Sequence, residues 1–205
     1  MRGIYAITDE SLLAGKDLES AVRATLEAGI CLLQYRSKSL PVETRLQQAR
    51  LLQQCCQEFN VPLLINDDVQ LCLETGAAGV HLGQGDTDLA AARSRLGAEA
   101  IIGISCHDSV EAALQAQSGS ADYVAFGRFF PSSTKPQATP ADPGVLERAK
   151  SQISIPLVAI GGINPENGAA LVEAGADMLA VIHSIFAADD IYRQTRRLVA
   201  LYEDR

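Results

Sequence analysis

The sequence predicts an α/β protein that folds as a single (β/α)8 barrel, also called a TIM barrel, and three observations support this prediction. Eight short apolar runs, rich in β-branched residues, alternate with segments of helical spacing along the chain. Glycine closes several of these helical segments just before the next apolar run. The 205 residues leave roughly 25 residues for each repeat, which fits a barrel at the small end of its size range.

Each expected strand is a short buried run, and short buried runs between helical patterns indicate βαβ units and a parallel sheet. Helical spacing is clear in the first connecting segment, where Leu18, Val22 and Leu26 are four residues apart. Gly76 and Gly175 supply the left-handed residue that commonly closes a helix. The expected strands are residues 4–7, 30–35, 62–65, 79–82, 100–104, 123–126, 156–160 and 178–182.

An open, doubly wound sheet is the main alternative fold. Such a sheet usually has fewer strands in this length, and no Gly-x-Gly-x-x-Gly motif opens the first helical segment. No linker, low-complexity block or charge run divides the chain. We therefore expect one barrel domain that spans residues 1–205.

Composition excludes several classes of function. The hydrophobic fraction of 47% and charged fraction of 20% are those of an ordinary globular protein. A formal net charge of −8 argues against a nucleic-acid surface, which needs a basic stripe. No apolar run approaches the ~20 residues of a membrane span, and the first residues show no signal-peptide pattern. We expect a cytoplasmic protein without nucleic-acid or membrane partners; a homo-oligomer is compatible with the sequence.

The five cysteines form no C-x-x-C pair and no Cys/His cluster of metal-ligand spacing. They are therefore interpreted as reduced thiols that pack as small hydrophobic side chains. The histidines likewise give no zinc site and no Ser/His/Asp or Cys/His arrangement for a covalent nucleophile. His81 is better explained as a satisfied interior histidine, and His107 as a residue that helps to cap the helix beginning near Asp108.

Polar side chains gather where the expected strands end, the edge that carries function in this fold. Gln34, Arg36 and Lys38 alternate at the end of the second strand, so they share one face. An amide with two cations suits a polyanionic group, because guanidinium offers a bidentate fork and ammonium a mobile charge. The alternative is a strand end that frays into solvent, with Lys38 paired to a nearby acid.

Asp67 and Asp86 follow the third and fourth strands. Two carboxylates from adjacent strands can approach one hard cation, and Mg²⁺ usually takes one or two carboxylates together with substrate phosphates. Either aspartate could instead cap the next helix. Asp68 and Asp88 compete for that capping role, which favours metal binding by Asp67 and Asp86.

Two further loops are candidates for anion binding. Gly161 and Gly162 follow the seventh strand and precede a helix that we expect to begin at Asn164, and glycine N–H groups there form the recurrent phosphate site of this fold. A Gly-Gly pair is otherwise only a tight turn. The loop after the sixth strand, residues 129–136, carries three hydroxyls and Lys135. Alone it is an ordinary surface loop, but at this rim it becomes a lid candidate between two anions.

These motifs, taken in order, resemble the thiamine phosphate synthase (thiamine-phosphate pyrophosphorylase) family. The resemblance runs from the first expected strand to the eighth. It is carried by Gln34-Tyr35-Arg36-Ser37-Lys38, Ile65-Asn66-Asp67-Asp68, Gly79-Val80-His81-Leu82-Gly83-Gln84 with Asp86, Gly103-Ile104-Ser105, Ser132-Ser133-Thr134-Lys135 and Ala159-Ile160-Gly161-Gly162-Ile163.

The resemblance implies a (β/α)8 barrel that condenses a pyrimidine-methyl diphosphate with a (carboxy)thiazole ethyl phosphate, releases pyrophosphate and uses Mg²⁺ bound by Asp67 and Asp86. It implies that the pyrimidine diphosphate is held by Gln34, Tyr35, Arg36, Ser37, Lys38, Asn66, Ser105 and Lys135. It implies that the thiazole phosphate is held by Ser132, Ser133, Thr134, Gly162, Ile182 and His183. The two departures are His183, where the family often has Ser, and Cys106, where Thr is common.

The implied reaction breaks a carbon–oxygen bond to diphosphate next to an electron-rich aminopyrimidine, so a dissociative path is expected. Arg36, Lys38 and Lys135 would then be the catalytic cations that stabilise the leaving charge. Two alternatives remain open at this point: a thiazole tautomerase-like phosphate-binding barrel, which needs a proton-transfer residue and no metal, and a non-catalytic sensor of phosphorylated ligands.

Overall fold

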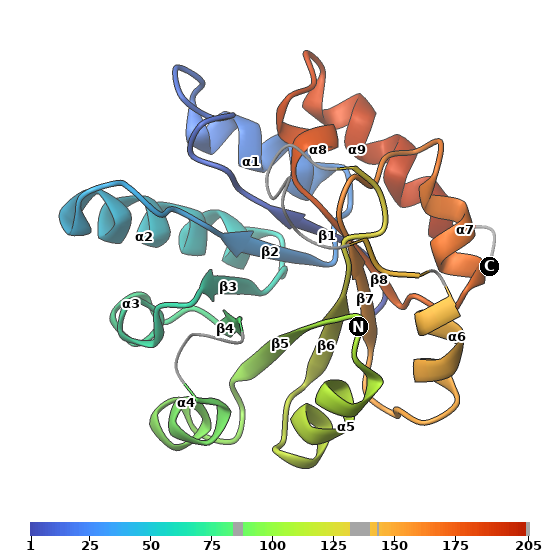
Figure 1. The fold of residues 1–205 in the computed structure, drawn as a ribbon. Helices are drawn as coiled ribbons and strands as arrows, with labels where there is room; N and C mark the ends of the chain where they lie inside the picture. The colour runs from blue at the N-terminus through green and yellow to red at the C-terminus, as the bar shows by residue number, and fades with distance from the viewer. Residues whose placement is uncertain (84–87, 132–139, 143, 204–205) are drawn as a thin grey trace.

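The computed structural model describes residues 1–83, 88–131, 140–142 and 144–203, and its centre is a closed parallel barrel (Figure 1). Each strand pairs in parallel with the next one along the chain, and the first pairs with the eighth. The fold class expected from the sequence is therefore confirmed. The strands are β1 (Gly3–Ile7), β2 (Leu32–Tyr35), β3 (Leu63–Asn66), β4 (Gly79–Leu82), β5 (Ile101–His107), β6 (Tyr123–Phe126), β7 (Leu157–Ile160) and β8 (Met178–Val181).

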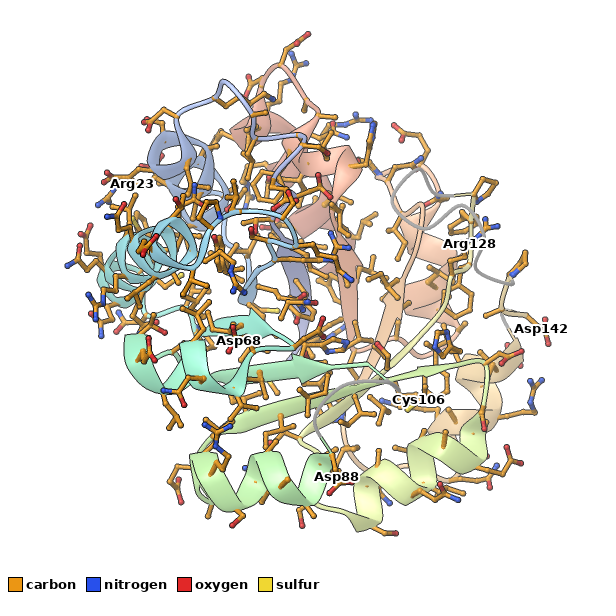
Figure 2. The ribbon with its side chains drawn as sticks, turned by 60° about the vertical axis from the view of Figure 1, so that its left-hand side comes forward. Arg23, Asp68, Asp88, Cys106, Arg128 and Asp142 are labelled. Carbon is orange, nitrogen blue, oxygen red and sulfur yellow. The ribbon has the colours of Figure 1, made fainter. Side chains whose placement is uncertain are left out.

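Helices surround the strands on the outside of the barrel (Figure 1). Several begin at a side chain that accepts a backbone N–H, as Asp68 does for α3 and Asp88 for α4, two residues labelled in Figure 2. In the described part of the chain, no helix is long and apolar enough to span a bilayer. The helices are α1 (Leu18–Glu27), α2 (Val42–Glu58), α3 (Val69–Thr75), α4 (Leu89–Leu96), α5 (Val110–Ser118), α6 (Gly144–Lys150), α7 (Gly168–Glu173), α8 (His183–Phe186) and α9 (Ile191–Val199), followed by a 3₁₀ turn, η1 (Ala200–Tyr202).

Alternation along each strand separates two cores. On β1, Ile4 and Ala6 belong to the large core between strands and helices, whereas Tyr5 and Ile7 belong to a smaller cluster. Successive side chains of a strand point to opposite faces, so this smaller cluster fills the barrel interior. It includes Leu32, Leu64, Tyr123, Val158 and Met178, each at most 1% exposed. Burial of such a side chain stabilises the fold by about 1.5–3 kcal/mol.

Two expected helix caps are wrong. Asn164 does not begin a helix: its side chain accepts the N–H groups of Glu166 and Asn167, closing a turn, and α7 begins only at Gly168. His107 does not cap α5, because Ser109 accepts the N–H of Ala112. In both places the helix begins further along the chain than expected, and a pattern of residue types does not fix at which residue it begins.

Candidate active site

A cavity of about 510 Å³ opens at the carboxyl ends of the strands. Side chains from β1 to β8 and the segments that follow them form its wall, so distant parts of the sequence meet there. Nine residues expected at the site line this cavity: Gln34, Arg36, Lys38, Asn66, Asp67, Ser105, Gly162, Ile182 and His183. Asp86, Ser132, Ser133, Thr134 and Lys135 lie outside the described residues.

The alternation predicted for the end of β2 is present. Gln34, Arg36 and Lys38 face the cavity. The intervening side chains do not line it: the Tyr35 hydroxyl donates to Oε1 of Gln48 at 2.8 Å, and the Ser37 hydroxyl donates to Oε2 of Glu10 at 2.7 Å. Tyr35 and Ser37 therefore contribute to the site through the path of the chain rather than through their side chains.

Two acidic residues after β1 hold the end of β2 in place. Asp9 Oδ2 lies 3.4 Å from Nη1 of Arg36. Glu10 accepts the N–H groups of Lys38 at 3.0 Å and of Ser39 at 3.2 Å, in addition to both serine hydroxyls. These bonds, the one from the Ser39 hydroxyl foremost, lower the pKa of Glu10 to about 2. The sequence analysis did not find this pair, since acids beside a strand end are common on surfaces.

The expected metal ligand Asp67 lies on the cavity wall in a left-handed backbone conformation, with a φ of 62°. Its N–H donates to the carbonyl of His81 at 2.9 Å, and Asn66 Nδ2 donates to its Oδ2 at 2.6 Å. As expected, Asp68 is occupied with capping, because it accepts the N–H of Leu71. Among the described residues no three His, Cys, Asp or Glu side chains form a metal cluster. A single carboxylate on a cavity wall that also carries Arg36 and Lys38 nevertheless fits Mg²⁺, which retains waters and takes oxygens of a bound anion.

The glycine turn after β7 is packed so closely that side chains would not fit. Gly161 and Gly162 have φ values of +106° and +66°, a region that L-residues with a Cβ rarely adopt. A Cβ on Gly162 would lie 2.4 Å from the carbonyl oxygen of Pro131. Asn167, which the sequence analysis did not assign, donates from Nδ2 to the carbonyl of Gly162 at 3.0 Å and ties the turn to the start of α7.

Next to this turn, α8 begins at His183, with Ile182 at its N-cap position, and both residues line the cavity. The first N–H groups of a helix point outward from its N-terminal end. An anion bound by these N–H groups would contact the backbone and not the side chain of residue 183. Histidine is therefore compatible with such a contact, although the family resemblance leads one to expect serine there.

A chain of hydrogen bonds joins five side chains across the barrel, and four of them, Tyr5, Gln34, His81 and Ser105, line the cavity. Gln34 Nε2 donates to the Tyr5 hydroxyl, which is 2.9 Å from the Tyr123 hydroxyl. The Tyr123 hydroxyl is 2.8 Å from Nδ1 of His81, whose Nε2 is 2.9 Å from Oγ of Ser105. Burial raises the pKa of both tyrosines above the ordinary value, so both stay protonated. The expectation of a satisfied interior histidine at position 81 is confirmed.

Three more cavity residues were missed because the sequence places them in loops of unknown path. His107 lies at the end of β5, where the register with β6 shifts between Ser105 and His107. An irregularity of this kind re-aims side chains, which explains why His107 faces the cavity. Gly127 and Arg128 follow β6, and Figure 2 shows Arg128 at the rim beside that segment. Only the path of the backbone reveals these positions.

The closed barrel, with its cations, carboxylate and glycine turn at one mouth, defines a (β/α)8-barrel enzyme with a site for anionic ligands. The family model described as thiamine monophosphate synthase matches residues 4–185. The chain belongs to the thiamine monophosphate synthase family, and it is a transferase of thiamine biosynthesis. The family resemblance drawn from the ordered motifs is thus confirmed.

Individual relatives agree with this assignment. The thiamine-phosphate synthase of Nitrosococcus oceani is 49% identical over 93% of this chain and 88% of its own length. That of Thioalkalivibrio sulfidiphilus is 48% identical over 99% and 96%. Among solved structures, the thiamine phosphate pyrophosphorylase of Pyrococcus furiosus has a TM-score of 0.90 and 32% identity, covering 98% of this chain and 96% of that one.

Proposed function

We propose that the protein joins 4-amino-2-methyl-5-(diphosphooxymethyl)pyrimidine to a thiazole ethyl phosphate, giving thiamine phosphate and pyrophosphate; where the thiazole is carboxylated, its carboxyl group leaves as CO2. The observation that carries this proposal is the division of one cavity wall into two anion-binding sectors. The end of β2 presents Arg36 and Lys38, whereas the segments after β7 and β8 present Gly162 and the start of α8. Two sectors suit two phosphorylated substrates.

The residues divide between the substrates as follows in this proposal. The pyrimidine diphosphate is bound by the segment Gln34 to Lys38, by Asn66 and Ser105, and by Lys135. The thiazole phosphate is bound by Gly162, Ile182 and His183, together with Ser132, Ser133 and Thr134. The cavity lining supports the described members of both sets except Tyr35 and Ser37, which belong to the first set only through the path of the chain. The loop residues complete both sets by their place in the sequence after β6.

Asp67, with Asp86, would hold Mg²⁺ at the diphosphate end of the cavity. When bound, the ion would offset negative charge on the diphosphate oxygens. The charges of the rim support this assignment, because Arg36 is already paired with Asp9 and the Lys38 segment is held by Glu10. A polyanion entering this sector therefore meets an Arg36 whose charge Asp9 partly compensates, and added positive charge improves binding.

The proposed chemistry places the protein's cations around the leaving group. The bond between the pyrimidine methylene carbon and the diphosphate oxygen breaks, and its electron pair leaves with pyrophosphate. Arg36, Lys38 and Lys135 stabilise that charge, and loss of one such contact costs about 2–4 kcal/mol. The thiazole nitrogen then donates its lone pair to the carbon. The glycine turn fixes the thiazole phosphate, so positioning contributes the rest.

The deciding experiment mixes the purified protein with both precursors, with and without Mg²⁺, and measures thiamine phosphate and pyrophosphate. We expect equimolar products that depend on Mg²⁺. Isomerisation of a thiazole phosphate without metal would instead support the tautomerase alternative. Ligand binding without any product would support a sensor.

The five free cysteines support the cytoplasm as the place of this activity.

A further inference from the structure

The hydrogen-bond chain from Gln34 to Ser105 has a direction, because each hydroxyl has a single proton to donate. Gln34 Nε2 donates to the Tyr5 oxygen, so the Tyr5 proton goes to its other partner, the Tyr123 oxygen. The Tyr123 proton then goes to Nδ1 of His81. A neutral imidazole that accepts at Nδ1 carries its proton on Nε2 and donates it to Ser105.

The two ends of the chain are therefore coupled. In this arrangement the carboxamide oxygen of Gln34 is left for the cavity, and Ser105 keeps its own proton for the cavity. If the direction of every hydrogen bond in the chain were reversed, both ends would change together. Ser105 would then accept a hydrogen bond from the cavity, and Gln34 would present its amide N–H groups to it. The Gln34 oxygen is thus an acceptor toward the cavity, and the Ser105 hydroxyl is a donor toward it. Neither role can change without the other, because Tyr5, Tyr123 and His81 connect the two groups.

The surroundings hold the three connecting side chains rigidly. Tyr5 and Tyr123 are at most 1% exposed, and their rings meet edge to face at 5.8 Å. Tyr123 stacks on His81, with ring centroids 5.6 Å apart. A Cβ on Gly103 would lie 1.9 Å from Cζ of Tyr123, so glycine at this position makes room for the ring. Because Tyr5 and Tyr123 are almost fully buried, leaving either hydroxyl unpaired carries a high cost.

We propose that Tyr5, Tyr123 and His81 are positioning residues that fix the carboxamide of Gln34 with its oxygen toward the cavity, where it accepts a hydrogen bond from the amino group of the pyrimidine substrate. This inference deepens the proposed function and rests on its pyrimidine substrate. A site built to pair a substrate N–H discriminates against an analogue that lacks the group, because its own acceptor is then left unpaired.

The test compares the binding of two non-reacting ligands by calorimetry: the monophosphate ester of the aminopyrimidine and the same ester without the amino group. For the native protein we expect the amino ligand to bind about 100-fold tighter. Tyr123→Phe removes one hydroxyl and should reduce this preference to about tenfold or less. The matched control is Tyr202→Phe, which deletes a buried tyrosine hydroxyl outside the cavity and should leave the preference unchanged.

A second variant guards against a Tyr123→Phe protein that fails to fold. Tyr5→Phe interrupts the same chain nearer to Gln34 and should cause a similar loss of preference. The double variant should lose little more of the preference for the amino ligand than either single variant, because each substitution alone already interrupts the same hydrogen-bond chain. The ¹⁵N chemical shifts of His81 give a readout without ligand: proton on Nε2 in the native protein, and a changed tautomer mixture in Tyr123→Phe.

The outcomes separate this inference from the proposed function. If the native protein makes thiamine phosphate but Tyr123→Phe and Tyr5→Phe keep the native preference, the inference is overturned and the function stands. A native His81 with its proton on Nδ1 would overturn it as well. If the native protein makes no thiamine phosphate yet prefers the amino ligand and loses that preference in both variants, the positioning role stands and the proposed reaction falls.

Discussion

The carboxylate of Glu10 lies 2.7 Å from the hydroxyl of Ser37, and this contact joins the segment after β1 to the segment that carries the cavity cations. The same carboxylate accepts backbone N–H groups from the two residues that follow Ser37. Glu10 therefore acts as a brace for the path of Lys38, although its own side chain does not line the cavity.

Replacing this brace should have an effect that depends on pH. Glu10→Gln is expected to lower the melting temperature at pH 7 by roughly 2–4 °C, which corresponds to about 1 kcal/mol for a partly exposed group. The pKa of Glu10 is about 2 when folded and 4.5 ordinarily, so the unfolded chain binds the proton more tightly. Its contribution is complete above pH 4.5 and is lost as the pH falls toward 2. Thermal melts of both proteins from pH 7 to 3 should converge; parallel curves would contradict this role.

Asp67→Asn should separate metal binding from folding. Asparagine tolerates the left-handed backbone that Asp67 adopts, so the melting temperature should change little. Loss of the charge should raise the Mg²⁺ concentration for half-maximal activity at least about tenfold. Asp88→Asn is the matched control, because it makes the same change at a helix cap. Equal Mg²⁺ titrations for all three proteins would remove Asp67 from the proposed metal site.

Gly162→Ala tests the close packing of the glycine turn. Gly162 and Gly76 share a φ of +66°, but a Cβ on Gly76 meets nothing within 4 Å, whereas one on Gly162 overlaps Pro131 and Phe130. Gly76→Ala should therefore show only the cost of a left-handed alanine, about 1–2 kcal/mol. Gly162→Ala should lose more stability and raise the KM for the thiazole phosphate about tenfold or more. Matching losses in the two variants, measured by denaturation and kinetics, would show that the turn is not sterically restricted.

The cysteines should be unreactive in the folded protein. Four of the five are buried, and burial raises the pKa of Cys56 and Cys106 to about 12. The reactive thiolate is therefore scarce at pH 8. A thiol reagent should label the native protein slowly, starting with the half-buried Cys31, and all five sites quickly in denaturant. Rapid labelling of Cys106 in the native state would contradict its placement.

The sequence predicts the strands well because each is a short, nearly continuous apolar run, and side chains alternate along it with a period of two residues. The same period predicts that Gln34 and Arg36 face the cavity while Tyr35 does not, as the structure confirms. Both signals are local, so they need no knowledge of the final packing. Helix starts are less certain, since Asn164 and Asn167 are equally good capping residues by type.

Contacts between distant strands could not be predicted in this way. Tyr5 and Tyr123 are separated by 118 positions, and each lies in an apolar run where an aromatic ring is explained by burial alone. Only closure of the barrel brings their hydroxyls together. The contacts of Glu10 could not be predicted for a related reason, because its partners belong to the segment after a different strand, β2.

The pairing of β1 with β8 also has a consequence for how the protein acquires activity. Gly3 lies opposite Met178, so the barrel closes only when the first strand pairs with the last one. Pairing over such a separation is slow compared with helix formation, because much chain entropy is lost before the contacts form. The cavity draws on β1, β2 and β8, and it cannot exist in a folding intermediate whose ring is still open. During refolding, recovery of ligand binding should thus lag behind recovery of the helical circular dichroism signal. The interval between the two recoveries measures the time that the barrel takes to close.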